Sequence, residues 1–163
     1  MSQVIGFPGR SLDPPPAGTP PYASEWPSTS MVNWETGAGN ARYWVLKMMI
    51  EELPTGAKRA PATASSDATL VHAQAFVTSA NGDARKVLVV SKSAEPVNVS
   101  VAGAVGGRLA WVDGSTGDQF GCTEDAAKGT TCIGRVPKLA SDTFTLGAFG
   151  TAIVVLPRDE MMV

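Results

Sequence analysis

The sequence predicts a mainly β protein, an antiparallel β-sandwich preceded by one strand–loop–helix unit. The helix is indicated by an apolar stretch with helical spacing that begins after Asn40 and ends before Pro54. The sandwich is indicated by the residues that follow, where short runs of alternating apolar and polar residues are separated by turn-forming residues. One helix followed only by hairpins is an unusual start for an independent domain. We therefore expect that the true N-terminus lies upstream of Met1.

The composition excludes several classes of function. The 163 residues are 44% hydrophobic and 17% charged, which is typical of a globular chain with a packed core. Because the net charge is −2, no basic surplus exists for binding nucleic acid or an anionic membrane, and neither partner is expected. No apolar run approaches the roughly 20 residues of a transmembrane helix, and residues 1–8 lack the features of a signal peptide. A secreted or extracellular location is favoured if the full-length protein is larger.

Residues 1–56 are interpreted as the last β/α unit of a truncated (β/α)8 barrel. Residues 2–7 form a short apolar run that predicts a buried strand. Residues 13–21 contain five prolines, which exclude helix and favour an extended loop. The helix follows this loop, as it does in a β/α unit.

The predicted helix is apolar on nearly every side. Asn40 is a suitable N-cap residue, and Pro54 cannot continue the helix. Four residues at helical spacing are predicted to form the main buried face: Tyr43, Leu46, Ile50 and Leu53. Trp44 and Met48 lie beside that face. Because the remaining polar face is narrow, we expect the helix to be packed on more than one side.

The rest of the chain is divided into three parts. Residues 57–69 are rich in Ala, Ser, Thr and Pro and are predicted to be a linker, residues 70–157 form the sandwich, and residues 158–163 are a tail. Strands are predicted at 71–78, 86–91, 97–101, 108–113, 143–146 and 151–156. Asn81-Gly82-Asp83 is a strong signal for a hairpin turn between the first two of these strands.

Cys122 and Cys132 flank a polar loop that contains glycine. If this loop connects a hairpin, their Cα atoms can reach disulfide distance. A secreted protein would favour the bond, whereas a cytosolic protein would keep two free thiols. No metal site is expected, because these cysteines and the single His72 are fewer than the four ligands of structural zinc. No cofactor is expected either, since the sequence contains no P-loop and no EF-hand pattern.

No catalytic residue is predicted. His72 lies on a predicted strand, and without a Gly-x-Ser-x-Gly elbow it is interpreted as a surface residue. Glu51 and Glu52 lie at the end of the helix and are predicted to be solvated. Asn98 begins an Asn-Val-Ser sequence, so it is a candidate N-glycosylation site within a predicted strand.

The order of these features resembles the C-terminal region of heparanase-like glycoside hydrolases, the retaining family that includes β-glucuronidases. Five segments carry the resemblance: Gln3-Val-Ile-Gly-Phe7, Ser30-Met-Val-Asn-Trp-Glu-Thr-Gly37, Asn40-Ala-Arg-Tyr-Trp-Val-Leu-Lys47, Leu146-Gly-Ala-Phe149 and Thr151-Ala-Ile-Val-Val-Leu156. They are similar to the family's final barrel strand, the turn after it, a helix opening with two aromatic residues, and a kink before the closing strand. The proline-rich residues 13–21 depart from this pattern. Barrel hydrolases of the β-xylosidase and arabinofuranosidase types look similar.

The resemblance implies a non-catalytic C-terminal part of an enzyme that hydrolyses O-glycosidic bonds with retention. The family's two catalytic glutamates lie on earlier barrel strands, so none is carried over, and this chain alone is expected to be inactive. The carbohydrate substrate would bind through the missing barrel, and the sandwich would pack on that upstream catalytic domain and support it. The loop after the last barrel strand borders the substrate cleft, so Asn33 and Trp34 are the candidate sugar-binding residues.

The alternative is a stand-alone carbohydrate-binding or structural β-sandwich protein. Aromatic residues exposed in a row on one sheet face would favour binding, but those of the strand region mostly alternate like core residues. An immunoglobulin-like adhesion domain is disfavoured, because Cys122 and Cys132 are too close in sequence and Trp111 precedes both.

Overall fold

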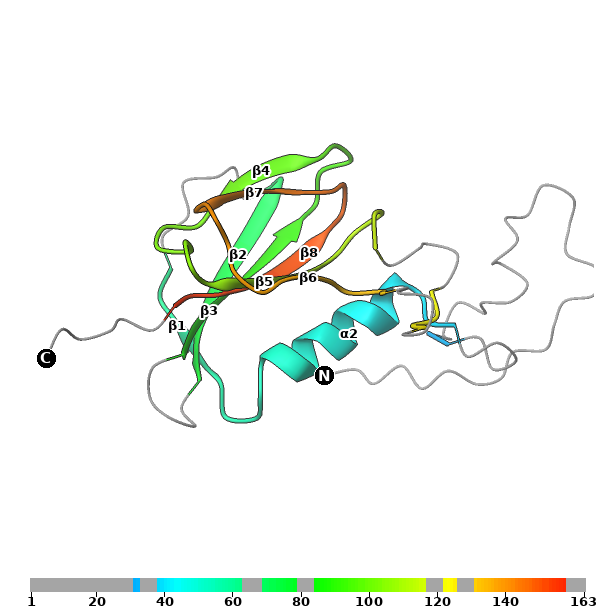
Figure 1. Ribbon diagram of the computed structural model, residues 1–163, viewed down its shortest axis with the longest axis horizontal. Helices are drawn as coiled ribbons and strands as arrows, with labels where there is room; N and C mark the ends of the chain where they lie inside the picture. The colour runs from blue at the N-terminus through cyan, green and yellow to red at the C-terminus, as the bar shows by residue number, and fades with distance from the viewer. Residues whose placement is uncertain are drawn as a thin grey trace, which may run out of the picture.

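A computed structural model shows a mainly β protein with one helix packed on antiparallel sheets, which confirms the predicted fold class (Figure 1). The structure describes residues 31–32, 38–62, 69–78, 84–116, 122–125 and 131–157. The predicted strand at 2–7 and the proline-rich loop at 13–21 lie outside these ranges. In the described part of the chain, no helix is long and apolar enough to cross a membrane.

In the residues that the structure describes, the secondary structure consists of one helix followed by strands. The elements are α2 (Ala41–Glu52), β1 (Lys58–Ala60), β2 (Val71–Thr78), β3 (Ala84–Ser91), β4 (Val97–Ser100), β5 (Arg108–Val112), β6 (Gly134–Val136), β7 (Thr143–Leu146) and β8 (Thr151–Val155). One sheet has six strands in the order β1-β2-β3-β8-β5-β6, and β4 and β7 form a second sheet of two strands. All paired strands are antiparallel.

The core lies in two layers, one on each face of the six-stranded sheet. The helix α2 covers one face, and the small β4–β7 sheet covers the other (Figure 1). Along the central strand β8, Ala152 and Val154 pack toward the small sheet, while Ile153 packs toward the helix. All three are 0% exposed. Because β8 is buried on both faces, its sequence is a continuous apolar run instead of an alternating one.

The helix begins and ends where the sequence predicts. The side-chain oxygen of Asn40 accepts a hydrogen bond from the Tyr43 backbone N–H at 3.1 Å, which confirms Asn40 as the N-cap. Leu53 is the C-cap residue, and Pro54 follows it. The ends of α2 are therefore set by local sequence.

The predicted buried face of α2 is wrong in two of its four residues. Leu46 and Ile50 are 42% and 76% exposed, whereas Trp44 and Met48 are buried at 4% and 0%. Because the helix is apolar nearly all round, the spacing of its apolar residues does not identify the side that packs on the sheet. The outcome leaves an exposed apolar side on the helix.

The strands predicted within residues 70–157 are confirmed, and two edge strands were not predicted. β1 lies inside the predicted linker at 57–69 and pairs with β2, and β6 pairs with β5 on the opposite edge. Both are short, and their pairing partner supplies the hydrogen bonds that hold them extended. β2 and β3 pair with Thr78 opposite Ala84, as a hairpin requires, while the Asn81–Asp83 turn lies outside the described residues.

Asp142 fastens the turns that connect β4 to β5. Its carboxylate accepts hydrogen bonds from the backbone N–H groups of Val105 at 2.8 Å and Gly103 at 3.2 Å. These bonds favour the ionised form and lower the pKa of Asp142, with the Val105 bond as the largest cause. Gly103 and Gly106 have φ angles of 76° and 81°, a conformation that favours glycine.

Candidate functional site

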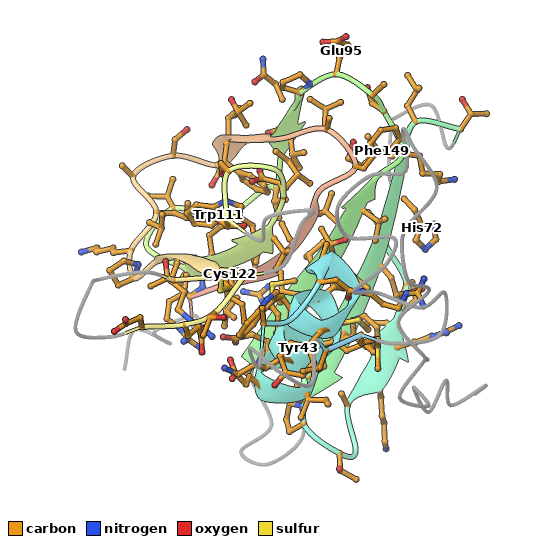
Figure 2. The ribbon with its side chains drawn as sticks, turned by 90° about the vertical axis from the view of Figure 1, so that its right-hand side faces the viewer. Tyr43, His72, Glu95, Trp111, Cys122 and Phe149 are labelled. Atoms are coloured by element: carbon orange, nitrogen blue, oxygen red, sulfur yellow. A yellow bond between two sulfur atoms is a disulfide. The ribbon has the colours of Figure 1, made fainter. Side chains whose placement is uncertain are left out.

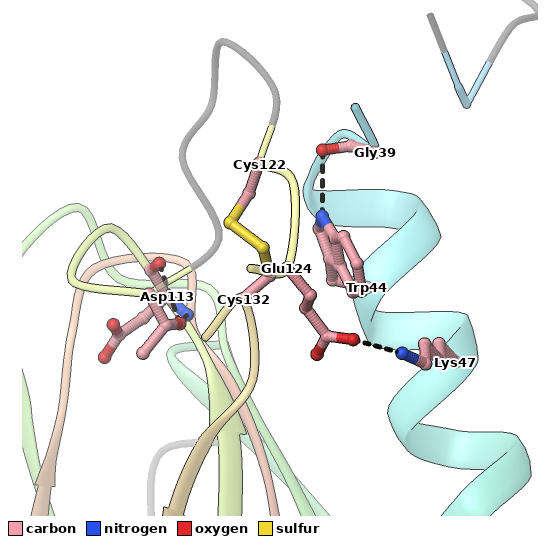
Figure 3. The surroundings of a disulfide bond; sticks show 8 residues. Gly39, Trp44, Lys47, Asp113, Cys122, Glu124 and Cys132 are labelled. Carbon is pink, nitrogen blue, oxygen red and sulfur yellow. Dashed lines mark hydrogen bonds and ion pairs between the residues drawn. A yellow bond between two sulfur atoms is a disulfide. The ribbon is translucent and has the colours of Figure 1, made fainter. Parts of the chain in front are cut away.

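The N-terminal end of α2 meets the segment between β5 and β6, and a disulfide lies at this junction (Figure 3). The structure joins Cys122 to Cys132 with a Cα–Cα distance of 5.8 Å, and both residues are buried in the helix-side core. Gly39 and Cys122 exchange two backbone hydrogen bonds of 2.8 and 2.7 Å. The disulfide thus lies beside the residue that precedes the N-cap of α2.

Trp44 and Lys47 extend this junction along the first turns of the helix (Figure 3). Trp44 Nε1 donates to the Gly39 carbonyl oxygen at 2.9 Å, and Lys47 Nζ donates to Glu124 Oε2 at 2.6 Å. The hydrogen bond that Lys47 donates to Glu124 is the largest cause that raises the pKa of Lys47. A Cβ atom at Gly39 would lie 2.4 Å from the Tyr43 ring, so only glycine fits there.

A cluster of four charged residues, here called the Glu52 cluster, lies at the other end of α2. It consists of Glu52, Lys86, Arg108 and Arg135. Arg135 Nη1 donates to Glu52 Oε1 at 3.2 Å, and the ammonium of Lys86 and the guanidinium of Arg108 lie 3.7 and 3.6 Å from Oε2. Lys86 also donates to the Glu52 backbone carbonyl. Glu52 is 6% exposed, so the prediction that it is solvated is wrong.

A cavity of about 140 Å³ lies beside the Glu52 cluster. Its charged lining comes from Glu52, Arg108 and Arg135, and its apolar lining from Leu109, Ala110, Val136, Pro137 and Val155. Glu52 is neutralised by three cations, and the neighbouring Glu51 carboxylate is bonded to Arg135. The cluster therefore anchors the end of the helix on the sheet and leaves neither carboxylate free for acid–base chemistry.

The structure describes only some of the other residues that the sequence analysis singled out. Asn33 and Trp34 lie outside the described residues, so their role stays a prediction. His72 is exposed on β2, and Asn98 is exposed on β4, where its Oδ1 accepts a hydrogen bond from Thr145 Oγ1 at 2.9 Å. Within the described ranges, no group of three or more His, Cys, Asp or Glu residues is arranged to hold a metal ion.

One candidate residue was missed by the sequence analysis. Phe149, in the turn between β7 and β8, is 68% exposed and has a φ angle of 51° (Figure 2). Its sequence neighbours Gly147 and Gly150 indicate a turn, but no local signal distinguishes an exposed ring from a buried one. The exposure of Phe149 follows only from how the turn packs on neighbouring segments in the structure.

The fold defines a class of protein, an antiparallel sandwich with a helix on one face, and the comparisons agree with that class. No family model matches the chain, and no curated protein matches it. It is similar in structure to a glycoside hydrolase family 30 endoxylanase from Clostridium papyrosolvens, with a TM-score of 0.52, 17% identity, and coverage of 81% of this chain and 31% of that chain. It is also similar to a family 30 subfamily 8 xylanase from Clostridium acetobutylicum, with a TM-score of 0.51, 17% identity, and coverage of 78% and 30%.

The chain spans about a third of the length of these two xylanases. It resembles the C-terminal portion of glycoside hydrolases of this kind. At 17% identity the likeness establishes the fold alone.

Proposed function

We propose that this chain is the non-catalytic C-terminal part of a retaining glycoside hydrolase, and that its sandwich supports an upstream catalytic barrel. The observation that carries the proposal is the exposed apolar side of α2. The inner side of this helix packs on its own sheet, yet Leu46 and Ile50 on the outer side are 42% and 76% exposed. A helix that is apolar all round is normally buried on every side. A catalytic domain that precedes the helix in the same chain would cover it.

The chemistry of retaining hydrolysis supports assigning catalysis to the upstream barrel and not to this chain. That reaction needs two carboxyl groups about 5 Å apart, one of which acts as a nucleophile. In this chain Glu51 and Glu52 both bond to Arg135, which opposes either role. We therefore assign the catalytic carboxylates to the barrel, and propose that Asn33 and Trp34 line the substrate cleft at its edge.

Two substrate classes are proposed for the complete enzyme. Xylan is proposed because the two similar structures are xylanases. A β-glucuronide is proposed because the sequence resembles the heparanase-like family. Both are O-glycosides, and both are hydrolysed by the same two-carboxylate chemistry.

The test compares this chain with the longer protein encoded by its complete reading frame. We expect the longer protein to hydrolyse xylan or an aryl β-glucuronide, and the 163-residue chain to hydrolyse neither. A reading frame that starts at Met1, or hydrolysis by the 163-residue chain, would contradict the proposal.

A pair of variants tests the support role of the sandwich. Ile50→Glu should lower the melting temperature of the longer protein and leave that of the 163-residue chain unchanged, because the partner surface exists only in the former. Val105→Glu is the matched control, since Val105 is 54% exposed and lies in the turn between β4 and β5. If Ile50→Glu and Val105→Glu behave alike in both proteins, α2 does not dock on the barrel.

The second candidate is a stand-alone carbohydrate-binding or structural sandwich protein. The exposed ring of Phe149 favours it. The reading-frame measurement separates the two, because a stand-alone protein has no upstream domain to cover α2.

A further inference from the structure

The turn between β7 and β8 is fixed by hydrogen bonds of its backbone. The Gly147 N–H donates to Asp113 Oδ2 at 2.9 Å, and the Gly150 N–H donates to the Gly147 carbonyl oxygen at 3.0 Å. The Phe149 N–H donates to the Ser93 carbonyl oxygen at 2.9 Å. The turn is therefore tied both to the end of β5 and to the segment after β3. None of these bonds uses the ring of Phe149.

Phenylalanine is an unfavourable choice at this position. Its φ angle of 51° lies in the left-handed region, where a side chain meets steric resistance and glycine does not. The residue is 68% exposed, so it adds little apolar burial to the fold. Glycine at position 149 would remove both disadvantages and keep every backbone bond. Folding alone gives no reason for the ring, and residues held in such conformations cluster where proteins bind ligands.

The Phe149 turn lies at the same end of the six-stranded sheet as the N-terminal end of α2. Glu52, at the C-terminal end of the helix, contacts Arg108 at the start of β5, whereas Trp44 packs with residues from the far end of β5. Asp113, which holds the turn, directly follows β5. Figure 3 accordingly shows Asp113 at the same end as the disulfide and the first turn of the helix. In a β/α unit the loop that precedes the helix N-terminus borders the substrate cleft.

Two exposed side chains, Leu70 and His72, belong to β2 and the residue before it, which pair with β3 and the segment after it. Leu70, 48% exposed, lies across from the Lys92–Ser93 segment, whose Lys92 N–H donates to the Leu70 carbonyl oxygen at 2.7 Å. His72 is exposed on the same side of the molecule as Phe149 (Figure 2). A pyranose ring offers an apolar C–H face that stacks on an aromatic ring, and hydroxyl groups that hydrogen-bond to polar neighbours.

We propose that Phe149 is a sugar-binding residue that stacks on one unit of a polysaccharide chain beyond the catalytic cleft. This inference rests on the proposed function, which supplies both the cleft and the polysaccharide. Because hydrogen bonds hold the turn in place, the ring is already positioned before the sugar binds, and binding requires little further ordering.

The test measures binding of the 163-residue chain to soluble xylan by affinity electrophoresis in native gels. Phe149→Gly and Phe149→Asn remove the ring and accept the left-handed backbone. We expect xylan to retard the unmodified chain, and both variants to weaken binding about threefold to tenfold. Val105→Ala, an exposed apolar residue in a different turn, is the matched control and should bind unchanged. The melting temperature of Phe149→Gly should equal or exceed that of the unmodified chain.

Three outcomes would overturn the assignment. Equal retardation of the unmodified chain and both variants would show that the ring does not touch the sugar. If xylan does not retard the unmodified chain, xylan is not a ligand of this chain. A dimer that Phe149→Gly converts to a monomer would show that a second copy covers the ring instead.

Failure here is distinguishable from failure of the proposed function. Binding is measured on this chain alone, whereas the proposed function is measured as hydrolysis by the longer protein. An active longer protein whose sandwich does not bind xylan would overturn only the role of Phe149. Retention by xylan without hydrolysis by the longer protein would overturn the hydrolase proposal.

Discussion

Removing the charge of Glu52 should strongly destabilise this chain. The Glu52 side chain is 8% exposed and accepts a hydrogen bond from Arg135 at 3.2 Å, with the Lys86 ammonium 3.7 Å away. Glu52→Gln keeps the size of the side chain and one acceptor oxygen but removes the negative charge. The Lys86 side chain, 9% exposed, would then keep only the Glu52 backbone carbonyl among the described residues. A nearly buried ammonium would be left without a counter-charge.

The expected loss is about 3 kcal/mol in the free energy of unfolding. Removing one partner of a buried ion pair costs roughly 3–5 kcal/mol, because the other charge stays buried without a partner. The side chains of Arg108 and Arg135 are 56% and 47% exposed, so their ion pairs with Glu52 add at most about 1 kcal/mol each. Glutamine can still accept from Arg135, which places the estimate at the lower end. Since small domains unfold with about 5–15 kcal/mol, the variant should remain folded and measurable.

Urea unfolding with linear extrapolation provides the assay. Glu51→Gln is the matched control, because Glu51 also bonds to Arg135 but its side chain is 38% exposed, and its loss should stay below about 1 kcal/mol. In a double-mutant cycle, Glu52→Gln combined with Lys86→Met should lose roughly 2 kcal/mol less than the sum of the single losses. Losses for Glu52→Gln and Glu51→Gln within about 0.5 kcal/mol of each other, or strictly additive effects, would refute the reasoning.

Three further predictions concern the disulfide, Asp142 and Lys47. Replacing Cys122 and Cys132 by alanine should lower the free energy of unfolding by roughly 2–3 kcal/mol, since the bond closes a short loop; an unchanged urea midpoint would contradict this. Asp142→Asn should destabilise at neutral pH. Because the native pKa of Asp142 is lowered, its contribution is present above the ordinary value of 3.8 and lost as the pH falls through the native pKa, so urea midpoints of variant and parent should converge only in strongly acidic buffer. Because Glu124 raises the pKa of Lys47, that contribution is present below the ordinary value of 10.5 and lost as the pH rises through the native pKa. The melting-temperature difference between Lys47→Met and the parent should therefore shrink only in strongly alkaline buffer.

The sequence by itself determined where the main elements lie. The alternation of apolar and polar residues located β2, β4 and β7, and the continuous apolar run located β8. Asn40 and Pro54 marked the two ends of the helix. These features were predictable because caps, turns and the period of a strand act between residues that are close in sequence. The pairing of Cys122 with Cys132 was left open by the sequence, since it depends on the path of the loop between them and on the redox environment.

Only the tertiary structure decided which surfaces are buried. The helix is apolar on nearly every side, so its own sequence could not choose between a face with Met48 and a face with Ile50; contact with β5 and β8 made that choice. From its neighbours in sequence, Glu52 at a helix end is expected to be solvated. It is buried because Lys86 of β3 packs against it and forms an ion pair. Phe149 has no local signal of exposure. Burial of a side chain is set by residues distant in sequence, and a short-range pattern does not contain them.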